Sequence, residues 1–254
     1  MPMTQSTVLD MPILAQSPFT PDEFAALNAR FERESPYAIL RWAADYFGDR
    51  LAVVTSFQPT GIVTLHYLHT IAPSTAVLTL DTGLLFSETY ALMDDLEARW
   101  SLNLIRVRPA LTPAGQAATF GDRLWAREPD RCCNMRKVIP LAPALAPYAA
   151  WVTGLRRDQT GRGTTPIVSW DAKYHKVKLC PFATWDDAMI WATIHGEELP
   201  YNALHDQNYP SIGCNTPECT RPANADGSGG ERAGRWAGSD KIECGLHTSD
   251  APNT

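Results

Sequence analysis

The chain has 254 residues and a mass of 28.0 kDa; 44% of the residues are hydrophobic and 20% are charged, which is typical of globular proteins rather than of disordered or coiled-coil chains. The net charge of −6 provides no overall basic field that would attract nucleic acid or an anionic membrane. The apolar runs are too short to span a bilayer, and residues 1–20 contain no lysine or arginine, so we expect a cytoplasmic protein without a signal peptide.

Helix and strand patterns alternate over the first 154 residues. One helix is predicted to begin after Thr20, and a second to run from Ser35 to a stop at Gly48. Short apolar runs then predict buried strands at 51–56, 76–80, 102–107 and 150–154, separated by helices at 61–70, 88–100 and 130–145. This alternation predicts an α/β fold with a mostly parallel sheet flanked by helices, and ligands bound beyond the carboxyl ends of the strands.

The residues after 154 have a different composition and pattern. A hairpin is predicted from 167–170 and 176–179, and a helix capped by Thr184 is predicted to extend through Glu197. Residues 206–254 are rich in Pro, Gly, Asp and Asn, and glycines 227, 229, 230, 234 and 238 predict a flexible C-terminal arm. We therefore divide the chain into a lead-in (1–20), an α/β nucleotide-binding domain (21–205) and a C-terminal segment (206–254).

Three polar loops follow predicted strands and are candidates for holding a nucleotide. Residues 56–61 (SFQPTG) join a strand to a helix N-terminus, where free N–H groups suit a phosphate; an ordinary capped turn is the alternative. Asp81 ends the second strand and suits a ribose or base amine, or a helix cap. Arg156 and Arg157 follow the fourth strand and suit an anion, or form a solvated basic loop. Their convergence on one sheet edge favours the nucleotide site.

Six cysteines are informative in a reducing compartment, where structural disulfides are rare. Four of them form two close pairs and offer thiolates for a tetrahedral zinc ion or a [4Fe–4S] cluster, namely Cys132, Cys133, Cys214 and Cys219. The alternative is a buried pair with two unrelated thiols. Cys180, next to Pro181, is expected to pack as a small hydrophobic residue.

Cys244 lies near the carboxyl end in a different setting. It follows a glycine-rich stretch that also carries Arg232, Arg235 and Lys241. Neighbouring cations lower the pKa of a thiol and favour the nucleophilic thiolate, and a flexible segment can deliver that group and withdraw it. The sequence therefore predicts a reactive thiol here, with an incidental cysteine as the alternative.

These motifs together resemble the assimilatory sulfonucleotide reductases, specifically the iron–sulfur type that reduces adenylyl sulfate. The matching stretches are TSFQPTG (55–61), LDTGLLFSETY (80–90), DRLWAREPDRCCNMRK (122–137), TGLRRDQ (153–159), LPYNALHDQNYPSIGC (199–214), RAGRW (232–236) and KIECGLH (241–247). The resemblance implies an adenine-nucleotide α-hydrolase-like domain related to the ATP pyrophosphatases (PP-loop proteins). It also implies assimilatory sulfate reduction, in the service of cysteine biosynthesis, as the setting.

The resemblance also implies roles for individual residues. Cys244 corresponds to the nucleophile that takes the sulfo group from adenylyl sulfate, releases AMP and leaves an S-sulfocysteine, from which thioredoxin or glutaredoxin then releases sulfite. His247, Arg232 and Arg235 are implied at the catalytic centre. The implied substrate-binding residues are Ser56, Phe57, Gln58, Thr60, Gly61, Asp81, Thr82, Gly83, Lys137 and Arg156. One [4Fe–4S] cluster per chain is implied on Cys132, Cys133, Cys214 and Cys219.

One departure and three rival functions stay open. The family usually has Cys-x-x-Cys as its second pair, whereas four residues separate Cys214 from Cys219, so the cluster is kept by a bulge, ligated differently or lost. The rivals are a reductase of 3′-phosphoadenylyl sulfate or of both nucleotides, an ATP-dependent adenylating enzyme, and a non-catalytic metal-binding or redox-sensing module. An adenylating enzyme normally reads SGGxDS where this chain reads SFQPTG. The sequence does not fix the oligomeric state, and a homo-oligomer stays open.

Overall fold

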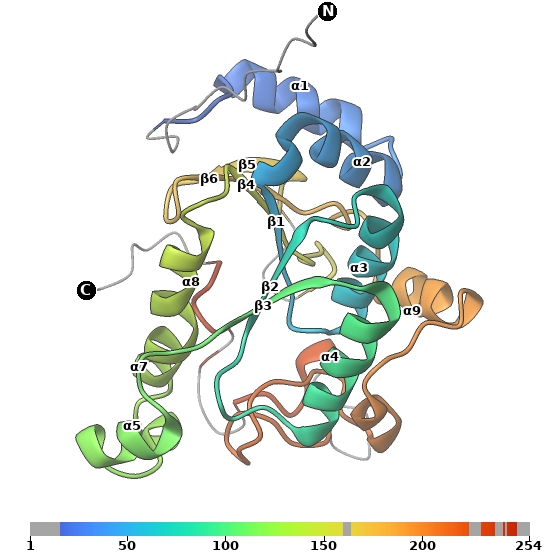
Figure 1. Ribbon diagram of the computed structural model, residues 1–254. Coiled ribbons are helices and arrows are strands. Elements are labelled where there is room, and N and C mark those ends of the chain that lie inside the picture. The colour runs from blue at the N-terminus through green and yellow to red at the C-terminus, as the bar shows by residue number, and fades with distance from the viewer. Residues whose placement is uncertain (1–15, 160–163, 224–229, 237–240, 242, 248–254) are drawn as a thin grey trace, which may run out of the picture.

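The computed structural model describes residues 16–159, 164–223, 230–236, 241 and 243–247. Six strands form one sheet in the order β3-β2-β1-β4-β6-β5 (Figure 1). All neighbours pair in parallel except β5 and β6, which form the predicted hairpin. The strands are β1 Leu51–Val54, β2 Ala76–Leu80, β3 Asn103–Val107, β4 Ala150–Val152, β5 Val168–Asp171 and β6 Lys176–Leu179.

Helices cover both faces of the sheet. In Figure 1, α3, α4 and α9 lie on one side, α7 and α8 lie on the other, and α1 and α2 cover one end. The helices are α1 Pro21–Phe31, α2 Pro36–Phe47, α3 Pro59–Ile71, α4 Ser87–Trp100, α5 Pro113–Phe120, α6 Leu124–Arg127, α7 Pro129–Cys133, α8 Ile139–Leu145 and α9 Asp187–Gly196. The predicted α/β class with a mostly parallel sheet is confirmed.

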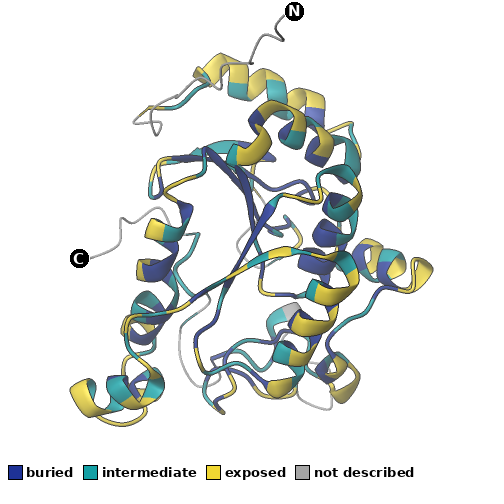
Figure 2. Cartoon of the chain, viewed as in Figure 1, coloured by how far each residue is buried: buried dark blue, intermediate teal, exposed yellow. Residues whose placement is uncertain are grey.

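The core has two layers because strand side chains alternate between the two faces. In β1, Leu51 and Val53 join the larger cluster with α2, α3, α4 and α9, whereas Ala52 faces the smaller cluster built on α8. The inner strands β1, β2, β4 and β6 are therefore largely buried on both sides, whereas the edge strand β3 is partly exposed, as are the outer faces of the helices (Figure 2). Cys180 is buried in the larger cluster, as expected for a thiol that packs as a small hydrophobic residue.

Helix ends agree with the local signals in most places. Thr20 forms a complete capping box with Glu23, Ser35 caps α2, and Gly48 ends α2 with a φ of +53°. The predicted cap Thr184 is wrong. Asp186 caps α9 through a 2.9 Å bond from the Met189 N–H, because residues 180–185 are occupied by two tight turns.

The strand order places the functional region. The chain runs outward from β1 to β2 and β3, then returns to place β4 on the other side of β1. The loops after β1 and β4 therefore diverge to opposite sides and leave a crevice, which is where open α/β sheets bind ligands.

The described part of the C-terminal segment packs on this α/β domain. Isolated bridges join Leu85 to Cys214 and Thr220 to Arg235. Glycines 227, 229 and 238, part of the predicted flexible arm, lie outside the described residues, as do residues 1–15 of the predicted lead-in. Within the described residues, no helix has the length and apolar character that crossing a membrane requires.

Candidate active site

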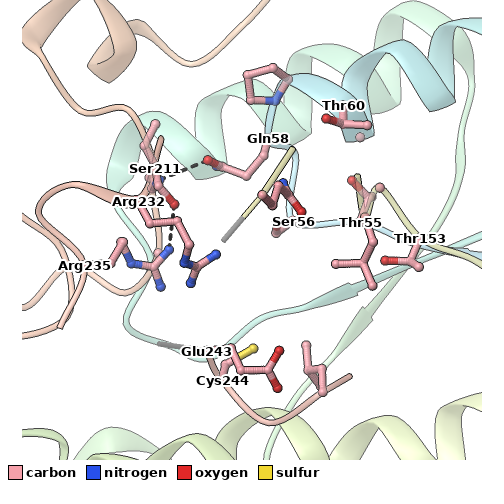
Figure 3. A pocket seen from close by; sticks show the side chains of 18 of the residues that line it. Thr55, Ser56, Gln58, Thr60, Thr153, Ser211, Arg232, Arg235, Glu243 and Cys244 are labelled. Atoms are coloured by element: carbon pink, nitrogen blue, oxygen red, sulfur yellow. Dashed lines mark hydrogen bonds between the residues drawn. The ribbon is translucent and has the colours of Figure 1, made fainter. Parts of the chain in front are cut away.

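A cavity of about 440 Å³ opens at the carboxyl ends of β1 and β4, a size within the ordinary range for small-molecule sites (Figure 3). Its walls come from the loops after both strands, the start of α9, residues 210–213 and the C-terminal segment. Of the implied substrate-binding and catalytic residues, the lining includes Ser56, Gln58, Thr60, Gly61, Lys137, Arg156, Arg232, Arg235, Cys244 and His247.

The loop after β1 is fixed by its own backbone. Phe57 has a left-handed φ of +56°, its side chain is fully buried, and its N–H donates to the Thr55 hydroxyl over 3.0 Å. The ring of Phe57, which the resemblance places at the nucleotide pocket, lies outside the cavity lining and anchors the loop in the core. Helix α3 follows, and the unpaired N–H groups of its first turn lie at the cavity with Thr60 and Gly61.

Replacing Gly61 with alanine is expected to disturb this loop. A Cβ at Gly61 would clash with the Thr55 hydroxyl oxygen, which accepts the Phe57 N–H. Overpacking of this kind typically costs about 1–3 kcal/mol, and here the displaced atoms border the cavity. We expect a lower melting temperature and weaker AMP binding by calorimetry. Gly196→Ala is the control, because open space surrounds a Cβ at that position. Equal AMP affinity in both variants would contradict the role given to the loop.

Arg156 lines the cavity but its charge is balanced. Its buried guanidinium forms two bonds to Asp158, at 2.9 and 3.0 Å, one to Asp187 at 3.2 Å and one to the Thr60 hydroxyl at 2.6 Å. It therefore ties the β4 loop to the starts of α3 and α9. Arg157 pairs with Glu32 and does not line the cavity. The expected pair of anion-binding arginines is thus not formed by these two side chains.

Positive charge gathers instead around Cys244. Arg232, Arg235 and Lys137 line the cavity together with this thiol, and Figure 3 shows Cys244 and the two arginines facing the same hollow. Burial by itself raises the pKa of Cys244. The charge of Lys137, the Leu246 N–H and the two arginines outweigh burial and lower the pKa below its ordinary value. The site therefore favours a thiolate inside a cavity that accepts anions.

The segment that carries Cys244 is docked in this structure. The Lys173 ammonium donates to the Gly245 carbonyl over 2.6 Å, and Lys241 pairs with Asp130 on α7. The His247 ring stacks on Trp151 with centroids 5.5 Å apart and planes inclined by 8°. These contacts hold Cys244 at the cavity and place His247 beside it.

Asp81, Thr82 and Gly83, which the resemblance places at the nucleotide, lie outside the lining of this cavity. Asp81 accepts bonds from the Tyr90 hydroxyl at 2.6 Å and Arg108 at 2.9 Å. The Thr82 carbonyl accepts from the buried Arg136, and the Thr82 hydroxyl lies 3.5 Å from the Cys214 sulfur. The strand end that carries them turns toward the cysteines rather than toward the crevice, so these residues brace the neighbouring thiol pocket.

That thiol pocket is formed by the four cysteines singled out in the sequence. Cys132, Cys133, Cys214 and Cys219 line one small pocket of about 10 Å³, the size of one water, together with Leu84, Trp125, Pro129, Arg136 and Lys137. Burial raises the pKa of Cys132 and Cys219, and raises that of Cys133 to about 12. In the part of the chain that the structure describes, no three His, Cys, Asp or Glu side chains are placed to hold a single metal ion.

The two sites share a wall. Residues Asn134–Val138 form a π-helical turn between α7 and α8, a feature common at functional sites, and it carries Lys137 to the border of both pockets. Trp236 is the other shared element. Its indole lines the cavity, packs on Cys133, Cys214 and Cys219, and has three cations over its face, Arg235 at 4.5 Å, Arg232 at 5.1 Å and Lys241 at 5.4 Å.

Comparison with known proteins identifies the family. Residues 50–222 match the phosphoadenosine phosphosulfate reductase domain family. The chain belongs to this family. An adenosine 5′-phosphosulfate reductase from Salinibacter ruber is 48% identical over 92% of each chain, and a phosphoadenosine 5′-phosphosulfate reductase from Gloeobacter violaceus is 46% identical over 87% of this chain and 92% of the relative.

Solved structures agree with the reductase family fold. A phosphoadenylyl-sulfate reductase from Candida auris, in a phosphate complex, superposes with a TM-score of 0.71 at 28% identity, covering 77% of this chain and 96% of the other. An FMN adenylyltransferase from Candida glabrata shares the fold with a TM-score of 0.52 at 16% identity, covering 82% and 67% of the two chains. This second likeness concerns the fold alone.

Within this reductase family chain, sequence reasoning missed several site residues. Trp236 lies in the RAGRW stretch, but no role was predicted for it. An aromatic residue between clustered cations is nevertheless a sequence signal for a cation–π contact. Trp191, on the apolar side of the cavity, and Lys173, which holds the Cys244 segment, gave no local signal, because their roles depend on contacts between distant elements.

Proposed function

We propose that this protein reduces adenylyl sulfate to sulfite and AMP, with electrons from a dithiol such as thioredoxin or glutaredoxin. One observation carries the proposal: the Cys244 thiol, with its lowered pKa, shares a cavity at the nucleotide-binding crevice with Arg232, Arg235 and Lys137. The names of relatives such as the reductase from Salinibacter ruber support the same substrate.

The cavity suits the two ends of this substrate. The phosphosulfate, which is anionic, fits the end that carries Cys244 and the three cations. The adenosine fits the part of the cavity that the loops after β1 and β4 form, and the cavity lining also offers the apolar side chains of Leu155, Met93 and Trp191. Glu243 borders the cation-rich end.

The first step is a transfer to sulfur. The Cys244 thiolate attacks the sulfo sulfur, a bond forms between the two sulfur atoms, and the bond from that sulfur to the phosphate oxygen breaks. The electron pair of the broken bond leaves with AMP. Negative charge grows on the sulfonyl oxygens and on the departing phosphate, and fixed guanidinium and ammonium groups stabilise that charge without reorganising.

The second step is a two-electron reduction by the dithiol. One thiolate of the donor attacks the Cys244 sulfur, and sulfite leaves with the electron pair of the sulfur–sulfur bond. The second thiol of the donor then closes a disulfide and returns Cys244 as a thiol. The donor is oxidised and the sulfo group is reduced, so the cycle needs no other reductant.

We also propose that Cys132, Cys133, Cys214 and Cys219 hold one [4Fe–4S] cluster. Four thiols line a common pocket bordered by Arg136 and Lys137, whose charges stabilise thiolates. A cluster suits this arrangement better than one zinc ion, because each thiolate binds a separate iron and the sulfur atoms need not converge on one point. The thiols must move apart to admit it. When bound, the cluster supplies a local electrostatic field beside Lys137.

Iron and acid-labile sulfide analysis of anaerobically purified protein tests whether the four cysteines hold a cluster. Absence of iron after careful reconstitution would refute the cluster proposal.

Reduction of 3′-phosphoadenylyl sulfate is the second candidate, favoured by the name of the relative from Gloeobacter violaceus. At the end opposite to Cys244, Arg156 is balanced by Asp158 and Asp187, and these carboxylates oppose a further phosphate. We therefore expect a higher kcat/KM for adenylyl sulfate when both nucleotides are compared with a saturating dithiol donor. A strong preference for the 3′-phosphorylated nucleotide would overturn the choice, and absence of sulfite with either would overturn the function.

A further inference from the structure

The second cysteine pair is separated by two more residues than the usual family spacing, and the structure shows where they go. The Cys219 and Thr220 N–H groups both donate to the Thr216 carbonyl over 2.9 Å, so the loop closes as a single turn. Asn215 and Pro217 point to solvent, and none of residues 215–218 lines the thiol pocket. The extra length therefore bulges outward while both thiols face inward.

The bulge contributes one side chain that reaches back across the pocket. One carboxylate oxygen of Glu218 accepts a 3.1 Å bond from the indole N–H of Trp125, and the other pairs with Arg123. The Arg123 side chain is 65% exposed, so its ion pair with Glu218 is screened by solvent. The bond to Trp125 is half-buried and gives the indole N–H the partner that such a group needs.

Trp125 is the group that this bond positions. It lies on the short helix α6, lines the thiol pocket, and packs against Cys133, Cys214 and Cys219. Helix α6 has only four residues and begins after Arg123, whose φ of +54° is left-handed, so little else in the helix itself fixes the indole. A contact from the opposite side of the pocket is therefore well placed to hold it.

We propose that Glu218, supplied by the longer cysteine loop, is a positioning residue that holds the Trp125 indole over the four thiols. The indole then limits the access of water and oxidants to the thiols. The part of this inference that concerns protection of a bound cluster rests on the function proposed above. The part that concerns access to the four thiols is independent of that function.

The test measures access to individual thiols in iron-free, anaerobic protein. Each variant receives a short pulse of iodoacetamide, and mass spectrometry of the peptides gives an alkylation rate for each cysteine. Glu218→Ala is expected to raise the rates at the pocket cysteines about tenfold, as local opening of the cover would. Glu218→Gln, which keeps an acceptor oxygen, should stay near the parent. Glu128→Ala is the matched control, because the Glu128 side chain pairs with Arg131 and does not line the thiol pocket.

Cys180 serves as an internal reference, since it is buried in the larger core cluster. Equal pocket rates in Glu218→Ala and Glu128→Ala would overturn the inference. If Glu218→Ala also exposes Cys180, the fold has loosened, and Trp125→Phe decides: it keeps an aromatic side chain, although a smaller one, and removes the N–H that bonds to Glu218. Faster alkylation of the pocket cysteines with Cys180 unchanged supports the inference, and unchanged rates overturn it.

The same variants report on the cluster when iron is bound. The visible absorbance of the cluster should bleach in air faster in Glu218→Ala than in Glu128→Ala. Equal bleaching rates would refute the claim that the indole shields the site from oxidants. If the wild-type protein binds no iron, the cluster proposal is wrong. The alkylation rates still test whether Trp125 covers the thiols, because they are measured in iron-free protein.

Discussion

Replacing Cys244 with serine is expected to abolish sulfite formation while leaving AMP binding nearly unchanged. Serine keeps the shape of the side chain, but a hydroxyl is a far weaker acid and nucleophile than the Cys244 thiol, whose pKa is lowered by Lys137 and Arg235. Loss of a covalent nucleophile lowers turnover by about 10⁵-fold or more in well-studied enzymes, and we expect a loss of that order. Turnover is measured as sulfite released with excess dithiol, and AMP affinity by calorimetry.

Cys180→Ser is the matched control for this substitution. Cys180 is the cysteine buried in the larger core cluster, away from the cavity lining, so its loss should affect stability rather than the chemical step. Retained turnover in Cys244→Ser would refute the nucleophile assignment. Loss of AMP binding together with turnover would instead indicate that the cavity had collapsed.

Replacing Lys137 with methionine is expected to slow the reaction and shift its pH dependence. Lys137 borders both the cavity and the thiol pocket, and although burial acts to lower its pKa, the neighbouring cysteines raise it, so the ammonium stays charged. A charge placed where negative charge develops contributes about 3–4 kcal/mol, which corresponds to a loss of roughly 10²–10³-fold in kcat.

The direction of the pH shift follows from the Cys244 thiol. The thiolate is the reactive form and is populated above the pKa, which Lys137 lowers. Without Lys137 that pKa rises, so the acid limb of the kcat/KM profile should move to higher pH. Lys137→Arg, which keeps the charge, should recover part of the activity and return the limb toward its original position. An unshifted acid limb in Lys137→Met would show that another group sets the state of the thiol.

Local signals were enough for much of the fold. The caps at Thr20 and Ser35, the stop at Gly48 and the apolar strands depend on residues within one or two turns. Both caps and the stop are found as predicted, and the strands are found with some ends shifted by one or two residues. Helix α6 and the π-helical turn at Asn134–Val138 were missed, because neither has a local signature distinct from an ordinary helix or loop.

The candidate site was also predicted only in part. The cavity brings together Cys244, Arg232, Arg235 and Lys137, which were named from motifs scattered over more than 100 residues. The surroundings of Asp81 could not be predicted, because the sequence shows that it ends a strand but not which neighbour the strand end faces. Its partners Tyr90 and Arg108 lie on α4 and after β3, and only the folded chain brings them to it.

The central claim is that Cys244 captures a sulfo group from a nucleotide held in the cavity. Incubating the enzyme with adenylyl sulfate in the absence of any thiol donor, followed by peptide mass spectrometry, tests it most directly. We expect the mass of one SO₃ unit on the peptide that contains Cys244, with AMP released in equal amount. Release of AMP with that peptide unmodified, or the added mass on a different cysteine, would contradict the account.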